Sequence, residues 1–202
     1  MPNWCSNSIH IQGSTDTLKT LWEQAQTNWK NEDYGLLNAM VPMPQALKGT
    51  RSPAPDDGSQ PYVDGHTNWY DWCVENWGTK WDISEGHADV EELATAHPIL
   101  QARLTISTQT AWAPPTEALD FYHQENPEYI VKCFYYEPGM DFAGIWEDGY
   151  DDMLTDLHDD SIDWNEPASL AQKLDEMYGI CEEHAQYDDE EIDEISIANE
   201  SR

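Results

Sequence analysis

Apolar and polar side chains alternate strictly in two segments of this chain, and this period-2 pattern constrains the fold more than any other feature. Residues 8–12 place Ile9 and Ile11 on one face, and residues 104–110 repeat the alternation with Leu104 and Ile106. Such a pattern is typical of a strand with one buried face. A helix-spaced apolar stripe follows each segment, over residues 14–29 and 115–125. Each predicted unit therefore buries one face of a strand beneath a helix.

Three further strands are expected, at residues 79–84, 129–136 and 142–146. The last two form a hairpin through a turn rich in Pro and Gly. A short helix over residues 68–76 is expected to end at Gly78 in a left-handed cap. The order strand, helix, strand, strand, helix, strand predicts an α+β fold of the ferredoxin-like, or split βαβ, type. In this fold the sheet is antiparallel and the helices cover one face.

The chain divides by composition into residues 1–149, the predicted α+β domain, and residues 150–202, an acidic extension. The domain includes a long excursion at residues 31–66, which contains five prolines and cannot be a continuous helix or a central strand. Residues 141–202 contain 21 acidic residues and only two basic ones. Within the extension we expect a helix at about residues 167–184, followed by a frayed tail.

The charge balance excludes several partners. The chain has 40 Asp and Glu against 9 Lys and Arg, a net charge of -31, which opposes direct binding to nucleic acid or to an anionic membrane. The sequence contains neither an apolar run long enough for a transmembrane helix nor the features of a signal peptide, so we expect a cytoplasmic protein. The chain has four cysteines, Cys5, Cys73, Cys133 and Cys181, which are scattered and form no CxxC pair. This arrangement favours reduced thiols over disulfides or a zinc knuckle.

Motifs for catalysis or cofactor binding do not stand out. The seven histidines form neither an HExxH helix nor a clustered metal spacing, and the sequence lacks a P-loop, a GxSxG elbow and a GxGxxG fingerprint. We therefore expect no metal site, no cofactor and no enzyme activity.

Five unusual phrases occur in one order along residues 1–149: MPNWCSN, VPMP, NWGTKWD, TAWAPP, and YEPG followed by FAG. Together they resemble the YubB-like family of phage and plasmid proteins. The resemblance implies a ferredoxin-like domain from a mobile genetic element, and it implies no particular reaction. The motif residues that carry it are Trp4, Cys5, Asn76, Trp77, Gly78, Lys80, Trp81, Trp112, Pro114, Glu137 and Gly139.

Lys80 lies in sequence between two tryptophans, Trp77 and Trp81. Desolvation there could lower the pKa of a lysine and make it a catalytic base. The alternative is that both indoles fill the core and that Lys80 pairs with one of the many acids. Tryptophans could also stack nucleic-acid bases, but the scarcity of basic residues favours core or partner-facing roles for Trp4, Trp69, Trp72 and Trp112.

The acidic extension has three possible explanations: simple solvation, adaptation to concentrated salt, or a surface for a basic partner. In a phage or plasmid setting, the third predicts a non-enzymatic accessory protein that binds a basic, nucleic-acid-handling host protein as a DNA mimic or an anti-defence inhibitor. The alternatives are a salt-adapted structural module and an enzyme that uses the Lys80 region. The predicted partner-binding residues are Asp151, Asp152, Asp156, Asp159, Asp160 and Asp163.

Overall fold

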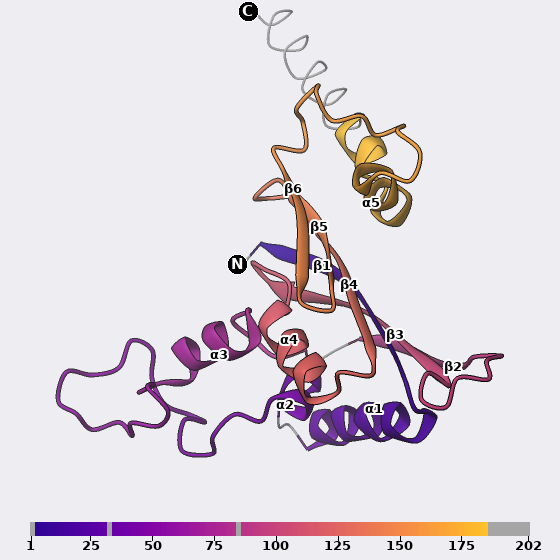
Figure 1. Ribbon diagram of the computed structural model, residues 1–202. Helices are drawn as coiled ribbons and strands as arrows, with labels where there is room; N and C mark the ends of the chain where they lie inside the picture. The colour runs from indigo at the N-terminus through magenta and orange to yellow at the C-terminus, as the bar shows by residue number, and fades with distance from the viewer. Residues whose placement is uncertain (1–2, 32–33, 84–85, 186–202) are drawn as a thin grey trace, which may run out of the picture.

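A computed structural model describes residues 3–31, 34–83 and 86–185. Its centre is a six-stranded antiparallel sheet in the order β2-β3-β1-β4-β5-β6 (Figure 1). The predicted α+β class with an antiparallel sheet is thereby confirmed. The strands are β1 (Trp4–Gly13), β2 (His87–Glu92), β3 (Ala102–Ala111), β4 (Ile130–Glu137), β5 (Phe142–Glu147) and β6 (Tyr150–Thr155).

The main core lies between one face of this sheet and four helices. In the sheet, Ile9 of β1 lies opposite Ile106 of β3 and Cys133 of β4, and all three are fully buried. Apolar residues of the predicted helical stripes, such as Leu18 and Leu119, pack against them. The helices are α1 (Thr15–Lys30), α2 (Leu36–Met40), α3 (Trp69–Trp77) and α4 (Thr116–Glu125). As predicted, α1 and α4 share one face of the sheet.

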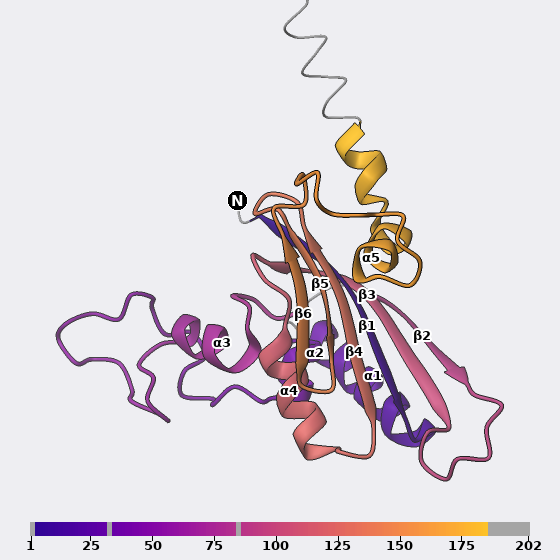
Figure 2. The ribbon, with the colours of Figure 1, turned by 45° about the horizontal axis from the view of Figure 1, so that its top comes forward.

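The opposite face is partly covered by helix α5 (Leu170–Tyr178), as Figure 2 shows, with α1 and α2 behind the strands. Leu174 and Ile180 pack there on Tyr136 and Ala143, together with Leu157 from the loop after β6. The sheet therefore separates a large core from a small one. No helix in the described part of the chain combines the length and the apolar character that crossing a membrane requires.

The strand predicted at residues 79–84 is wrong, because residues 79–83 lie in bends and loop. The carboxylate of Asp82 accepts backbone N–H groups of Gly35, Leu37 and Asn38 at the start of α2, at 2.6, 2.7 and 2.9 Å. The backbone carbonyl of Ile83 accepts the indole N–H of Trp29. This segment therefore caps a helix in the 31–66 excursion, and β2 takes the expected place beside β3.

The acidic region begins inside the sheet. The boundary predicted at residue 149 falls in the turn between β5 and β6, and β6 pairs with β5 along its whole length. The predicted helix at 167–184 is divided, since α5 ends at Gly179 in the left-handed conformation, with φ of 68°, and residues 180–185 form a separate helical turn. The tail predicted from residue 187 lies outside the described residues.

Candidate binding groove

The uncovered part of the second sheet face carries a row of uncharged polar side chains. Ser6 of β1 lies opposite Gln109 of β3, and Ser8 lies opposite Ser107. They form the floor of a cavity of about 800 Å³ between these strands and α5. We call this cavity the groove and define it by Trp4, Ser6, Ser8, Trp81, Asp82, Ser107, Gln109, Met177 and Tyr178.

Two exposed indoles form one end of the groove. Trp4 begins β1, and Trp81 lies in the loop after α3. Their ring centroids are 6.1 Å apart, with 44% and 39% of the respective residues exposed. Neighbouring exposed tryptophans are unusual on a protein surface and are typical of a place where a partner or ligand binds.

The wall opposite the strands comes from α5. The hydroxyl of Tyr178 donates a hydrogen bond to the backbone carbonyl of Ser6 at 3.4 Å, and its ring lies 5.7 Å from that of Tyr136. A second cavity, of about 580 Å³, shares Tyr178 and Ser6 with the groove and continues toward Glu137 and Gly139. Helix α5 therefore lies beside a continuous hollow along the sheet.

Lys80 lies among aromatic rings, but only one of the two tryptophans that the sequence suggested, Trp81, is among them. Its Nζ is 4.5 Å from the centroid of Trp81, 4.8 Å from that of Trp112 and 5.9 Å from that of Tyr70. Trp77 is instead fully buried and donates its indole N–H to the carbonyl of Val41 at 3.0 Å. The ammonium of Lys80 thus makes cation–π contacts with these rings, and Trp81 belongs both to this cluster and to the groove.

The motif residues, far apart in sequence, gather mainly at one end of the sheet. Trp112 donates its backbone N–H to the carbonyl of Asn3 at 2.9 Å, and Cys5 lies opposite Thr110. Most of these residues serve packing or turns. Gly78 has a φ of 78°, and an added Cβ would lie 3.1 Å from the carbonyl oxygen of Pro114. Asn76 donates a hydrogen bond from its side-chain amide to a carbonyl within α3. Glu137 accepts the backbone N–H of Gly139 at 3.1 Å. Trp4 and Trp81 are the motif residues that line the groove.

The six predicted partner-binding aspartates are exposed, but they do not share one surface. On β6, Asp151 lies opposite Trp146 and Asp152 opposite Ile145, so they point to different faces of the sheet. Asp159 and Asp163 accept the backbone N–H groups of Ser161 and Asn165, at 2.7 and 3.0 Å. The hydrogen bonds from Ser161 lower the pKa of Asp159. The remaining two are Asp156 and Asp160, in the same loop.

All four cysteines are free thiols, in agreement with the sequence prediction. Cys5, Cys73 and Cys133 are buried in the main core, and Cys181 is half-buried. Burial raises the pKa of the Cys5 thiol to about 12, so this thiol is protonated at neutral pH.

The groove was not predicted, although its signal is present in the alternation of β1 and β3. Between the apolar residues, Ser6, Ser8, Ser107 and Gln109 all fall on the second face. The alternation predicted a role only for the opposite, buried face of each strand. Met177 and Tyr178 fall within the helix predicted at about residues 167–184, and their place beside the strands depends on how α5 packs.

Comparison of the chain with protein-family models, with curated proteins and with solved structures found no match in any of the three. The groove is therefore interpreted from its own geometry and charge.

Proposed function

We propose that this chain is a binding protein that takes an extended basic segment of a partner protein into the groove. One observation carries the proposal: in a chain of net charge -31, two exposed indoles flank a groove of about 800 Å³ whose floor is uncharged and polar. The volume is in the range of cavities that hold ligands.

Each part of the groove matches one chemical feature of such a segment. The face of Trp4, and the face of Trp81 that points away from Lys80, suit the ammonium or guanidinium group of a lysine or arginine, an interaction worth about 0.5–2 kcal/mol. The hydroxyls of the serines and the amide of Gln109 can donate to and accept from the main chain of an extended peptide. The negative field of the whole chain attracts basic partners and speeds their encounter.

The exposed aspartates of β6 and of the loop at residues 156–163 contribute to this attraction in our proposal; they are called the acidic surface below, although they face different sides of the sheet. In a phage or plasmid setting the partner is a basic, nucleic-acid-handling host protein, and the carboxylates replace the phosphates that it normally contacts. The chain is then a non-enzymatic accessory protein. Asp152, Asp156 and Asp160 are the exposed aspartates that best fit this role, because the side chains of Asp151, Asp159 and Asp163 accept hydrogen bonds within the fold.

We also propose that residues 1–149 have the ferredoxin-like topology of the YubB-like family. The order β2-β3-β1-β4 with α1 after β1 and α4 after β3 supports this topology, since it is the order of a split βαβ unit. Motif residues from phrases far apart in sequence lie together at one end of the sheet, which supports the view that the phrases maintain one shared piece of structure. Strands β5 and β6 extend the sheet beyond that unit.

The test measures binding of a fluorescent, extended ten-residue peptide of alternating Arg and Ser, with a Glu and Ser peptide as the charge control. The native chain should bind the Arg peptide and not the Glu peptide. Trp4→Ala and Trp81→Ala should each weaken binding by roughly 3- to 30-fold, the loss of one cation–π contact. Tyr62→Ala, which removes another exposed ring in the 31–66 excursion, is the matched control. Equal affinity in all three variants would contradict the proposal.

A second comparison separates the groove from the acidic surface. Asp152→Lys with Asp160→Lys should slow association of the Arg peptide and reduce its salt dependence. Asp16→Lys with Glu23→Lys, an equal charge change on α1, should do so less. If both pairs act alike, only the net charge matters and the acidic surface has no specific role.

A further inference from the structure

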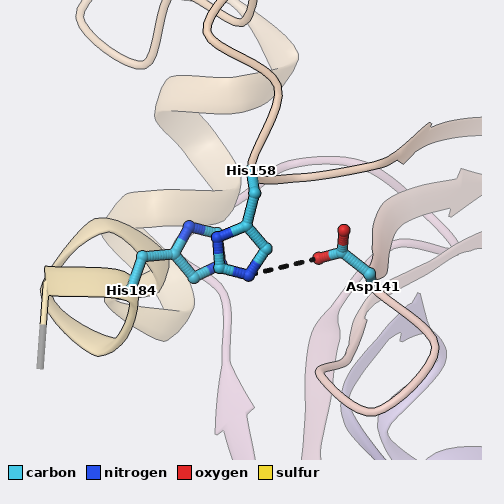
Figure 3. Close-up of side chains that lie close together, drawn as sticks. All are labelled: Asp141, His158 and His184. Atoms are coloured by element: carbon cyan, nitrogen blue, oxygen red, sulfur yellow. Dashed lines mark ion pairs between the residues drawn. The ribbon is translucent and has the colours of Figure 1, made fainter. Parts of the chain in front are cut away.

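Three side chains that can bind a metal ion come together where the C-terminal segment meets the sheet. Asp141 lies in the β4–β5 turn, His158 in the loop after β6, and His184 in the helical turn after Gly179 (Figure 3). One ligand atom from each of the three lies within 4.8 Å of the others. Nε2 of His158 is 3.9 Å from Oδ1 of Asp141, and the two imidazole rings stack with centroids 3.7 Å apart.

The backbone that carries each donor is anchored by its neighbours. Leu157, directly before His158, and Ile180, four residues before His184, are both buried in the small core. The buried carboxylate of Glu137 accepts the backbone N–H groups of Gly139 and Met140, which holds the turn that carries Asp141. The donors are therefore positioned by the fold, while the side chain of His158 stays 58% exposed and can be reached by an ion.

We propose that Asp141, His158 and His184 bind one late first-row divalent cation, with Zn²⁺ as the reference ion. Two imidazoles and one carboxylate suit Zn²⁺, Co²⁺ or Ni²⁺, whereas Mg²⁺ and Ca²⁺ prefer all-oxygen ligands. Zinc–ligand distances of about 2.0–2.2 Å place neighbouring donors about 3.3–3.6 Å apart in a tetrahedral site. The separation of 3.9 Å between His158 and Asp141 exceeds that value, and the two imidazole rings, which stack on each other, must turn so that one nitrogen of each points at the ion.

Three protein donors leave one position of a tetrahedral ion for water or for a partner's ligand. His158 and His184 also line the second cavity, of about 580 Å³, which adjoins the groove. The ion would link the helical turn at residues 180–185 to the β4–β5 turn. The net charge of -31 would raise the concentration of cations near the protein. This site is independent of the peptide binding proposed above and does not require it.

The test is calorimetric titration of the metal-free full chain with ZnCl₂ in excess Mg²⁺, which saturates weak sites on exposed acids. We expect one site per chain. His158→Ala, His184→Ala and Asp141→Asn should each weaken it by more than about 100-fold, because loss of a ligand's hydrogen-bond partner alone costs about 10- to 100-fold. A Zn²⁺ concentration of 100 times Kd should raise Tm by about 5–10 °C in the native chain, and not in these variants.

Two control variants separate this site from other zinc donors. His87→Ala removes an exposed histidine on β2, and Cys181→Ser removes the half-buried thiol. Both should keep the full affinity, and bound Co²⁺ should give visible d–d bands without thiolate charge transfer. The proposal is overturned if either control abolishes the site, if the three ligand variants bind Zn²⁺ like the native chain, or if Mg²⁺ suppresses all uptake. Circular dichroism of each variant verifies that its fold is retained.

Discussion

The hydroxyl of Tyr135 donates a 2.7 Å hydrogen bond to Oδ1 of Asp151 and so links β4 to β6 across the intervening strand. The tyrosine passes over Gly144 of β5, where an added Cβ would lie 2.2 Å from the phenol oxygen. Burial, and then the bond to Asp151, raise the pKa of Tyr135, so the phenol stays a donor at neutral pH. Asp151, predicted as a partner-binding residue, therefore has a structural role in the sheet.

Tyr135→Phe should lower the free energy of unfolding by about 1–3 kcal/mol, because the carboxylate of Asp151 loses its donor. Urea unfolding followed by tryptophan fluorescence measures this loss. Tyr150→Phe is the matched control, because Tyr150 is 83% exposed on the same hairpin and should be nearly neutral. If the two tyrosine variants lose the same stability, the bond between Tyr135 and Asp151 contributes nothing.

Gly144→Ala should be more damaging than Tyr135→Phe, since the methyl group overlaps the ring rather than only removing a bond. Combining the two changes gives a direct check. Tyr135→Phe removes the nearest atom, so the double variant should lose less stability than the sum of the single variants. Strict additivity would mean that Gly144 is needed for another reason.

Asp82 should be one of the most sensitive polar positions in the chain. Its carboxylate accepts four backbone N–H groups, three at the start of α2 and one from Ile83 at 2.7 Å. Asp82→Ala leaves these donors without their acceptor, and the expected loss is about 3 kcal/mol or more. Asp56→Ala, on an exposed part of the 31–66 excursion, should change Tm very little. A small loss at Asp82 would show that water replaces the carboxylate.

The same residue predicts a pH dependence. Burial raises the pKa of Asp82 from 3.8 to about 6, against the opposing effect of its backbone donors. The native state then binds more protons than the unfolded state between these two values, so this contribution to stability is full below pH 3.8 and is lost as the pH rises through 6. The difference in unfolding free energy between the native chain and Asp82→Asn should therefore shrink from pH 4.5 to pH 7. If the difference in unfolding free energy grew with pH, the pKa of Asp82 would be lowered by folding and not raised.

Thiol reactivity should differ between the native and the unfolded chain. Four thiols should react with a disulfide reagent in denaturant, because all four are free. In the native protein Cys181 should react first, and slowly, since burial and Asp175 raise its pKa to about 11. Cys5, Cys73 and Cys133 should wait for unfolding. Cys181→Ser should remove the early phase, and an early phase that persists would place a core cysteine at the surface.

The interior strands could be predicted because their own sequence shows which face is buried. Ile9 and Ile106 alternate with polar residues, and both were assigned correctly. The edge strands β2 and β6 could not, because they are largely exposed and lack a clear apolar face. Their extended form comes from hydrogen bonds to β3 and β5, which a local pattern does not reveal. Trp81 and Ile83 alternate with polar residues as in a strand, but their segment forms a loop in which Asp82 caps the start of α2.

The candidate sites show the same limit. Trp4 and the polar row on β1 are visible in the sequence once the second face is treated as a possible surface for a ligand. The cluster of Asp141, His158 and His184 has no local spacing, since its donors come from three segments that only the packing of Leu157 and Ile180 brings together. Sequence reasoning about metal ligands works where donors share one helix or one knuckle.

The unequal size of the two cores implies that this protein unfolds in steps. In the described part of the chain, the small core contains five buried residues, Leu157, Leu174 and Ile180 from the C-terminal side and Tyr136 and Ala143 from the sheet. The strands and helices on the other side share one large cluster. Amides of α5 should therefore exchange with deuterium through a low-energy local opening, and those of β1 only when the whole molecule unfolds. Helix α5 forms one wall of the groove, so each local opening of α5 exposes the floor of the groove to solvent from that side. An ion bound at His158 and His184 would slow this opening and the deuterium exchange that reports it.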